Sequence, residues 1–251
     1  MELDWKVEAD DIRKVQELSE RMAKSFLVKK RERRNVERIE KPSYSRELFW
    51  YATVSCLLTT QQRVGPGSPV NRFIKADPFP LSLERCVQVD DLKTTVAKTI
   101  TEFGGLRWAN KIGEHVSSNL DWLKRGGWDT IERVVENLDH QQTQKSERAA
   151  ATIIDDEMRG FGPKQARNLL QMLGLTKFEI PIDSRVIRWL NNNGFPVRLS
   201  PLALADRHYY EFILDGIQQL CHACSIYPCM LDAMIFASFD EAEWNADNFI
   251  W

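Results

Sequence analysis

The stretch that decides the fold is residues 158–170, which read MRGFGPKQARNLL. Glycine suits the left-handed conformation that ends many helices, so we expect a helix to stop at Gly160. Pro163 suits the first position of a new helix, because its ring fixes φ and its missing N–H is not needed there. The stretch therefore predicts two helices joined by a tight hairpin that contains Gly160 and Gly162.

This hairpin is a candidate anion site. Gly160 and Gly162 let another molecule come close to the backbone, and the free N–H groups at the start of a helix attract phosphate oxygens. An ordinary tight turn between two helices uses the same glycines, so the Gly-x-Gly pattern alone leaves both interpretations open.

A lysine and an aspartate follow the turn at positions that suit chemistry. Lys164 comes directly after Pro163, in the first turn of the second helix, and Asp183 stands nineteen positions later, after Ile180-Pro181-Ile182. Asp183 opens the next expected helix as an N-cap candidate. If the two helices fold back on each other, the amine and the carboxylate face one gap. A solvated lysine and a merely capping aspartate are the alternative.

The rest of the chain predicts an all-α protein. Apolar residues recur at steps of three and four from Asp10 to about Leu27, and residues 48–58 are apolar on nearly every face, as in a buried central helix. Further helices are expected near 82–103, 106–124, 128–138, 145–159, 164–173, 183–193, 200–223 and 226–239. The basic run 29–34 is expected to be a solvated helix end or linker, with a phosphate-binding patch as the alternative.

Composition narrows the class of protein. The chain has 251 residues, of which 43% are hydrophobic and 28% charged, which excludes disordered and fibrous proteins. The formal net charge of −2 gives no general attraction to polyanions, so any nucleic-acid surface must be local. The acidic start and the lack of a long apolar run predict no membrane association and a soluble protein of the cytoplasm.

The cysteines predict neither disulfides nor a metal. Five cysteines are an odd number, which favours reduced thiols over a disulfide framework. Cys221, Cys224 and Cys229 are close in sequence, but an iron–sulfur cluster needs a fourth cysteine. We therefore expect no metal site and no cofactor, and small buried side chains at these positions.

The motif around Lys164 and Asp183 resembles that of a known superfamily. Residues 160–166 (GFGPKQA) and 180–186 (IPIDSRV) resemble the helix-hairpin-helix DNA glycosylases with a Gly/Pro-rich loop and a trailing aspartate. The interval from lysine to aspartate is similar to that of the 8-oxoguanine DNA glycosylase/lyases. The resemblance covers about 45–240 and is strongest over 158–190. It implies one domain over 1–251, in which a helical subdomain of about 60–158 and a second one of about 1–59 plus 159–251 flank a cleft.

The resemblance also implies an activity. Lys164 would attack C1′ of a flipped-out damaged nucleotide and form a Schiff base, and strand scission by β-elimination would follow. Asp183 would stay ionised, and either stabilise the positive sugar or help to deprotonate Lys164. The expected substrate is an oxidised purine, 8-oxoguanine, in double-stranded DNA. We expect a monomer, associated with the nucleoid through DNA.

Further residues match positions that contact DNA in this superfamily. Gly160, Gly162 and Arg185 match phosphate contacts, although Arg185 could equally form a surface ion pair. Residues 57–62 (LLTTQQ) are similar to a helix end whose glutamine, here Gln61, enters the duplex beside the extruded nucleotide.

The expected base pocket consists of Asp232, Phe236 and Asn168. Phe236 would stack on the base and Asp232 would hydrogen-bond to it, by analogy with a similar helix in small microbial 8-oxoguanine glycosylases. A core phenylalanine and a helix-start aspartate are the alternative. Asn168 departs from the pattern, because relatives often carry a cysteine or an aromatic residue there, which puts the identity of the base in doubt.

Two other functions compete with this one. The same lysine chemistry could act on another damaged or modified base. A non-enzymatic helix-hairpin-helix protein could grip DNA without chemistry, although such a binder needs only the hairpin and not the pair of Lys164 and Asp183.

Overall fold

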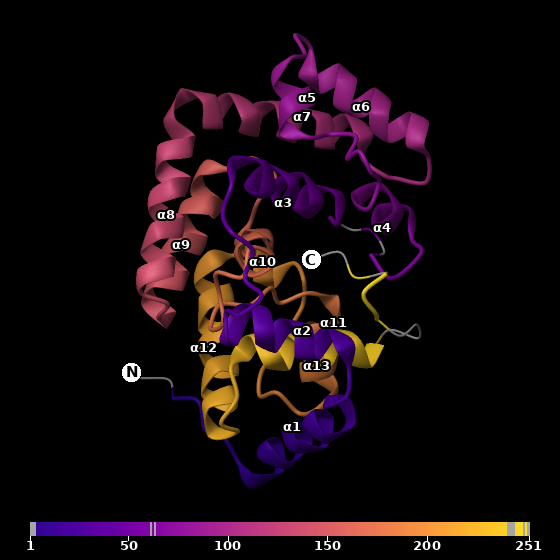
Figure 1. The fold of residues 1–251 in the computed structure, drawn as a ribbon. Helices are drawn as coiled ribbons and strands as arrows, with labels where there is room; N and C mark the ends of the chain where they lie inside the picture. Colours follow the sequence, from indigo (N-terminus) through magenta and orange to yellow (C-terminus); the bar gives the residue numbers. More distant parts are fainter. Residues whose placement is uncertain (1–3, 61, 63, 240–243, 248, 250–251) are drawn as a thin grey trace.

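The computed structural model describes residues 4–60, 62, 64–239, 244–247 and 249, which form helices joined by short loops (Figure 1). No strand occurs among these residues, so the predicted all-α class is confirmed. The helices are α1 (Ala9–Met22), α2 (Phe26–Arg31), α3 (Arg46–Leu58), α4 (Pro69–Ile74), α5 (Leu83–Val87), α6 (Leu92–Phe103), α7 (Ala109–Trp122), α8 (Trp128–His140), α9 (Gln144–Glu157), α10 (Pro163–Met172), α11 (Ser184–Asn192), α12 (Arg207–Ala223) and α13 (Pro228–Phe239).

Helix α3 lies at the centre of the molecule. It begins after Ser45, whose side chain accepts a hydrogen bond from the backbone N–H of Leu48. Phe49, Trp50 and Val54 are almost completely buried, as the apolar sequence of this helix predicts. Helix α3 contacts α5, α7 and α10, so it connects the layer of α5, α6 and α7 with the rest of the protein (Figure 1).

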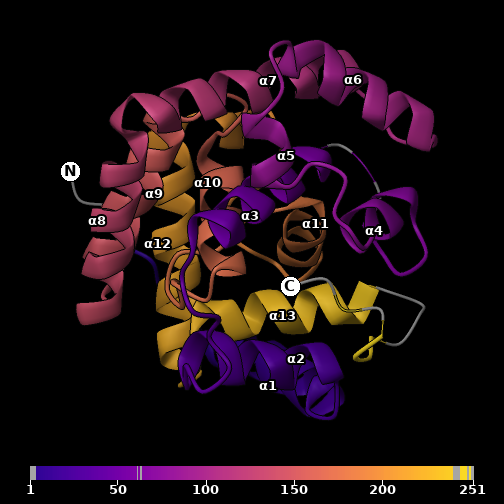
Figure 2. The same cartoon turned by 45° about the horizontal axis from the view of Figure 1, so that its top comes forward.

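The first two helices and the last helix form one layer on the other side of the molecule (Figure 1). Helices α1 and α2 both contact α13, and α1 also contacts α12 (Figure 2). The subdomain boundary expected near residue 158 falls directly after α9, which packs against α10. The division into two subdomains therefore remains a prediction, in which α9 is bound tightly to the second part.

Several helix boundaries differ from the expected ones. The helix expected at 82–103 is two helices, because α5 ends at Val87 and Asp91 starts α6 by accepting a hydrogen bond from Thr94 N at 3.1 Å. The helix expected to start near 200 starts at Arg207, after the capping residue Asp206. In each case a single capping side chain sets the boundary.

No single helix among the described residues is long and apolar enough to cross a membrane. Helices α12 and α13 reach the required length and hydropathy only together, and they are bent by 94° relative to each other.

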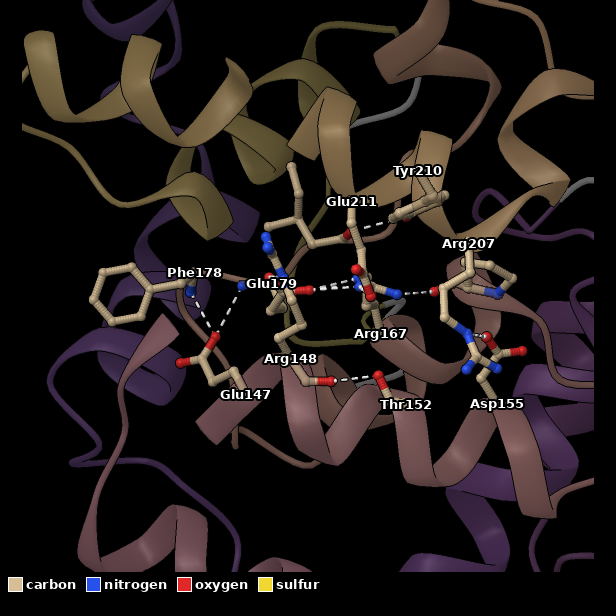
Figure 3. Close-up of polar contacts among 12 residues, drawn as sticks. Glu147, Arg148, Thr152, Asp155, Arg167, Phe178, Glu179, Arg207, Tyr210 and Glu211 are labelled. Carbon is tan, nitrogen blue, oxygen red and sulfur yellow. Dashed lines mark hydrogen bonds and ion pairs between the residues drawn. The ribbon is translucent and has the colours of Figure 1, made fainter. Parts of the chain in front are cut away.

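Helix α9 is anchored to residues 177–179 by a buried carboxylate (Figure 3). Glu147 Oε1 accepts a hydrogen bond from Lys177 N at 3.0 Å, and Oε2 accepts from Phe178 N and Glu179 N, both at 2.8 Å. Burial raises the pKa of Glu147 to about 7, although the three backbone N–H groups act in the opposite direction.

This raised pKa predicts a pH dependence of stability. The folded state binds the Glu147 proton more tightly than the unfolded state, whose carboxyl titrates near pH 4.3. The contribution of Glu147 to the free energy of unfolding should therefore fall as the pH rises from about 4.5 to about 7. The expected loss is on the order of 3 kcal/mol.

Denaturant unfolding at pH 5 and pH 8 checks this prediction. Glu147→Gln removes the titration, so the stability advantage of the wild type over this variant should be larger at pH 5. An advantage that grows toward pH 8 would contradict it.

Candidate functional site

The hairpin expected at residues 158–162 is present between α9 and α10. Gly160 has a φ of +82°, and a Cβ atom at this position would lie 2.2 Å from Nδ1 of His115. The left-handed backbone and the contact with His115 both exclude a side chain here. Asn119 on α7 holds the adjacent residue, because its Oδ1 accepts from Arg159 N at 2.7 Å and its Nδ2 donates to Arg159 O at 3.0 Å.

Gly162, in contrast, faces open space. No atom of the described chain outside its immediate neighbours lies within 4 Å of the position that its Cβ would take. Gly162 is also the N-cap of α10 and has no side chain that could bind the first N–H groups of this helix. The start of α10 therefore presents bare backbone, which is the arrangement that binds anions at helix N-termini.

A cleft of about 700 Å³ opens beside the start of α10. Lys164 from α10 and Asp183 from the start of α11 both line it, as the sequence predicts. The other expected site residues in its lining are Gly162, Asn168, Arg185, Asp232 and Phe236. Gly160 is not one of the described lining residues, since it packs against His115.

Asp183 is the N-cap of α11. Its Oδ1 accepts hydrogen bonds from Arg185 N at 2.8 Å and from Val186 N at 3.0 Å, whereas its Oδ2 lies 3.7 Å from Arg185 Nη1. The cap fixes the carboxylate at the wall of the cleft through one oxygen. Capping therefore occupies only Oδ1, while Oδ2 lies within ion-pair range of Arg185.

Gln165 connects the lysine helix to the end of α3. Its Nε2 donates to Cys56 O and to Thr60 Oγ1, both at 2.9 Å, and its side chain is nearly buried. Asn168 lies beside it, with Nδ2 3.3 Å from Gln165 Oε1 and 3.4 Å from Cys56 Sγ. Burial raises the pKa of the Cys56 thiol to about 12, so this cysteine is neutral.

Gln61, the expected wedge residue, lies outside the described residues. Its neighbour Gln62 lines the cleft and has a fixed amide group. The Oε1 of Gln62 accepts from Arg107 N at 2.8 Å, and its Nε2 donates to Leu58 O at 2.8 Å.

Arg185 and Phe236 form a stacked pair at the cleft. The guanidinium carbon of Arg185 lies 3.7 Å from the centroid of the Phe236 ring. The Phe236 ring also lies 5.8 Å from the ring of Trp244. A base that stacks on the same face of Phe236 must therefore displace Arg185 or stack on its guanidinium group. The phosphate contact expected of Arg185 remains a prediction.

Asp232 lies at the buried end of the cleft and is already engaged. Its Oδ2 accepts from Arg31 Nη1 at 2.9 Å and from Gln171 Nε2 at 2.8 Å. Burial raises the pKa of Asp232 above its usual range, although the charge of Arg31 acts in the opposite direction. Any contact between Asp232 and a base would therefore belong to a group of three polar side chains, which we call the polar floor: Arg31, Gln171 and Asp232.

Arg31 and Gln171 are site residues that the sequence did not predict. The basic run 29–34 is a helix end, as one of the two expectations had it, because it forms the end of α2 and the start of a π-helical turn over Glu32–Val36. Lys29 and Arg33 are exposed, but Arg31 is turned inward and pairs with Asp232. Burial, together with the nearby charge of Arg31, lowers the pKa of Arg34 to about 10. The apolar residues Leu27 and Val28 could have indicated that Arg31 is turned inward, because they are buried and lie four and three positions before Arg31 on the same helix.

The three C-terminal cysteines are separate from the cleft. Cys221 and Cys229 are buried, and burial raises the pKa of Cys229 to about 12. Within the described part of the chain, no group of three or more His, Cys, Asp or Glu residues could hold a metal ion.

Comparison of the sequence with known proteins gives no relative. No protein-family profile matches the chain, and no curated protein matches it significantly.

Comparison of the structure with solved structures does give matches. The chain is similar to the 8-oxoguanine glycosylase/lyase of Methanocaldococcus jannaschii in complex with a 15mer DNA containing 8-oxoguanine, with a TM-score of 0.68 and 19% identity over 93% of this chain and 99% of the other. A further structure of an 8-oxoguanine DNA glycosylase from this organism gives a TM-score of 0.66 and 18% identity over 93% and 95% of the two chains. The 8-oxoguanine DNA glycosylase of Thermotoga maritima gives a TM-score of 0.66 and 15% identity over 93% of this chain and 98% of the other. The chain therefore has the fold of archaeal and bacterial 8-oxoguanine DNA glycosylases.

Proposed function

We propose that this protein is a base-excision DNA glycosylase with an abasic-site lyase step, and that its substrate base is 8-oxoguanine. The observation that carries the proposal is that Lys164 and Asp183, from two separate helix starts, line one cleft beside the hairpin. A protein that only grips DNA needs the hairpin but has no use for an amine and a carboxylate in such a cleft. The similarity of fold to 8-oxoguanine DNA glycosylases supports the choice of substrate.

In the proposed reaction, the neutral amine of Lys164 attacks C1′ of the flipped nucleotide. The bond between C1′ and the base breaks, and the base leaves with its electron pair and takes up a proton. Loss of the amine protons and opening of the sugar ring then give an imine between Lys164 and C1′. Removal of a proton from C2′ expels the 3′-phosphate and cleaves the strand. The carboxylate of Asp183 stabilises the positive charge that develops on the sugar.

Binding of the DNA backbone is assigned to the start of α10. Gly162 leaves its backbone open, and the first N–H groups of the helix can donate to a phosphate on the strand that carries the lesion. The partner in this proposal is double-stranded DNA with one damaged base. The protein acts as a monomer, in the cytoplasm, in contact with the nucleoid.

The polar floor supports recognition of a base with N–H donors. Gln171 Nε2 donates to Asp232 Oδ2 at 2.8 Å, so the Oε1 of Gln171 points away from Asp232. This Oε1 is buried and accepts no hydrogen bond from any residue that the structure describes. A buried acceptor without a partner is costly, so it favours a ligand that supplies a donor. 8-Oxoguanine carries an N–H at position 7, where guanine has only an acceptor.

Gln171→Met should therefore reduce base selectivity. Methionine has a similar length but no acceptor, so the preference for 8-oxoguanine over guanine in base release should fall about 10- to 100-fold, which corresponds to about 1–3 kcal/mol. Cleavage of a duplex with a ready-made abasic site should stay near the wild-type rate, because no base is read there. Equal losses on both duplexes would show that Gln171 acts on the whole site rather than on the base.

A panel of duplexes tests the proposed function. Each duplex carries 8-oxoguanine, another damaged base, an abasic site or no damage, and base release and strand cleavage are scored separately. We expect base release from 8-oxoguanine and cleavage at the abasic site. If only a different base is released, 8-oxoguanine is not the substrate. Tight binding without any chemistry would indicate a non-enzymatic DNA-binding protein.

A further inference from the structure

A buried arginine lies directly behind the lysine of the cleft. Arg167 is on α10, three positions after Lys164, and only 1% of its surface is exposed. Its Nη1 donates to Pro163 O at 3.0 Å, which is the carbonyl group directly before Lys164. Its Nε donates to Glu179 Oε2 at 2.7 Å (Figure 3). The first turn of the lysine helix is therefore tied to the segment that leads to Asp183.

A buried tyrosine holds the other end of the same segment. Tyr210 on α12 has no exposed surface, and its hydroxyl donates to Ile180 O at 2.9 Å. The same hydroxyl accepts from Ile182 N at 2.6 Å, which is the amide directly before Asp183. One side-chain oxygen therefore fixes the backbone on both sides of Pro181.

These two anchors contact each other. The guanidinium carbon of Arg167 lies 4.6 Å from the centroid of the Tyr210 ring, a cation–π distance. Glu179, which pairs with Arg167, immediately precedes Ile180. An unbroken series of contacts thus runs from the backbone before Lys164, through Arg167 and Tyr210, to the backbone before Asp183.

The carboxylate in this series is fully engaged. Oε1 of Glu179 accepts from Arg148 Nε at 3.0 Å and from Gln218 Nε2 at 3.2 Å, while Oε2 faces Arg167 (Figure 3). Arg167 Nη2 lies 2.7 Å from the same Oε2 as an ion pair, although it makes no hydrogen bond to any described residue. Several bonds to one carboxylate restrict the positions that the buried side chains can take. Glu179 therefore restricts the position of Arg167.

Stabilisation of the fold does not by itself explain why these buried polar residues are present. A buried ion pair loses most of its attraction to the cost of desolvation, and apolar residues of similar size often stabilise a fold as well or better. Its effect is instead to fix geometry, and two groups that act on one sugar must be held within a fraction of an ångström.

We propose that Tyr210 and Arg167 are positioning residues that set the distance between the Lys164 amine and the Asp183 carboxylate. This inference rests on the proposed function, because it concerns the two groups to which that function assigns the chemistry. Tyr210 borders the cleft but has no exposed surface, and its hydroxyl is engaged by the backbone of Ile180 and Ile182. Arg167 lies behind the cleft and is 1% exposed, so both residues act on the backbone that carries Lys164 and Asp183.

Tyr210→Phe is the decisive variant, because it keeps the ring against Arg167 and removes only the two hydrogen bonds of the hydroxyl. We expect the single-turnover rate of base release to fall at least tenfold, while the Kd for the lesion duplex stays within about twofold. A merely structural role would lower the melting temperature but leave the rate unchanged at temperatures where the variant is folded.

The matched control is Tyr51→Phe. The Tyr51 hydroxyl donates to the backbone carbonyl of Ile74 at 3.3 Å, and Tyr51 is not among the described residues of the cleft. This control should lose some stability and keep its rate. An unchanged rate in Tyr210→Phe, or an equal loss in both variants, would overturn the positioning role.

A double-mutant cycle tests whether Tyr210 acts through Asp183. In an Asp183→Asn background, Tyr210→Phe should cost at most a small part of the loss that it causes in the wild type, because the two changes disable the same unit. If the rate losses of the two single variants multiply in the double variant, the two residues act independently and the proposal is contradicted.

Hydrogen exchange gives a readout that does not depend on activity. The amides of Arg185 and Val186 are bound by Asp183 Oδ1, so looser positioning of Asp183 in Tyr210→Phe should speed their exchange about tenfold. Unchanged exchange in this variant would overturn the positioning role. A wild-type protein that is inactive on every duplex would instead overturn the proposed function.

Discussion

Replacement of Lys164 by glutamine should abolish the covalent complex that borohydride traps between this protein and a duplex with 8-oxoguanine. Only an amine forms an imine with the opened sugar, and borohydride reduces that imine to a stable bond. Glutamine has a similar length but no basic nitrogen, so both base release and strand cleavage should fall to background. Denaturing gel electrophoresis of the trapped complex measures the effect directly.

The control for this experiment is Lys98→Gln. Lys98 is exposed on α6 and pairs weakly with Glu102, with a separation of 3.8 Å between Nζ and Oε1. This variant should be trapped like the wild type. Trapping that survives in Lys164→Gln would assign the nucleophile to another amine and remove the main support for the proposed reaction.

Asp183→Asn should slow base release by about two to three orders of magnitude, the range for loss of one electrostatic group that acts on the transition state. The amide oxygen of asparagine can still accept from Arg185 N and Val186 N, so the cap of α11 should persist. The Kd for the lesion duplex and the melting temperature should therefore change little, while the single-turnover rate falls.

Asp206→Asn is a matched control for this change. Asp206 caps α12 by accepting from Tyr209 N at 2.8 Å, and it is not a described residue of the cleft. It should keep the full rate of base release. If Asp183→Asn behaves in the same way, Asp183 is only a helix cap.

The hairpin and the two helix starts could be predicted from sequence because local chemistry specifies them. Pro163 and Asp183 each act on their own turn of backbone, and the structure places both as expected. Gly160 has the expected left-handed backbone, but α9 already ends at Glu157, so this glycine lies in the turn that follows the helix. The all-α class followed from apolar spacing over whole segments, which many residues determine together. Such features need no knowledge of what lies far away in the chain.

The polar floor could not be predicted, because its members come from distant parts of the sequence. Arg31 and Asp232 are 201 positions apart, and Gln171 and Asp232 are 61 positions apart. Leu27 and Val28 place Arg31 on the buried face of α2, whereas Lys29 is exposed. Only tertiary packing brings this face of α2 to Gln171 and Asp232.

The network behind Lys164 was missed for the same reason. Arg167 is twelve positions from Glu179, and its charge is what an exposed position on an amphipathic helix usually carries. Its burial depends on Tyr210, whose ring comes from α12. A charged residue in an amphipathic helix therefore cannot be assigned to solvent from spacing alone.

Because Arg185 stacks on Phe236, its guanidinium group competes with any planar ligand for that face of the ring. At 3.7 Å, the contact is close enough for a cation–π attraction of about 1 kcal/mol. A planar ligand that displaces the guanidinium from this face loses about fivefold in apparent affinity, whereas a ligand that stacks on the guanidinium does not. In the proposed function, a displacing base that also donates to Gln171 would recover this difference.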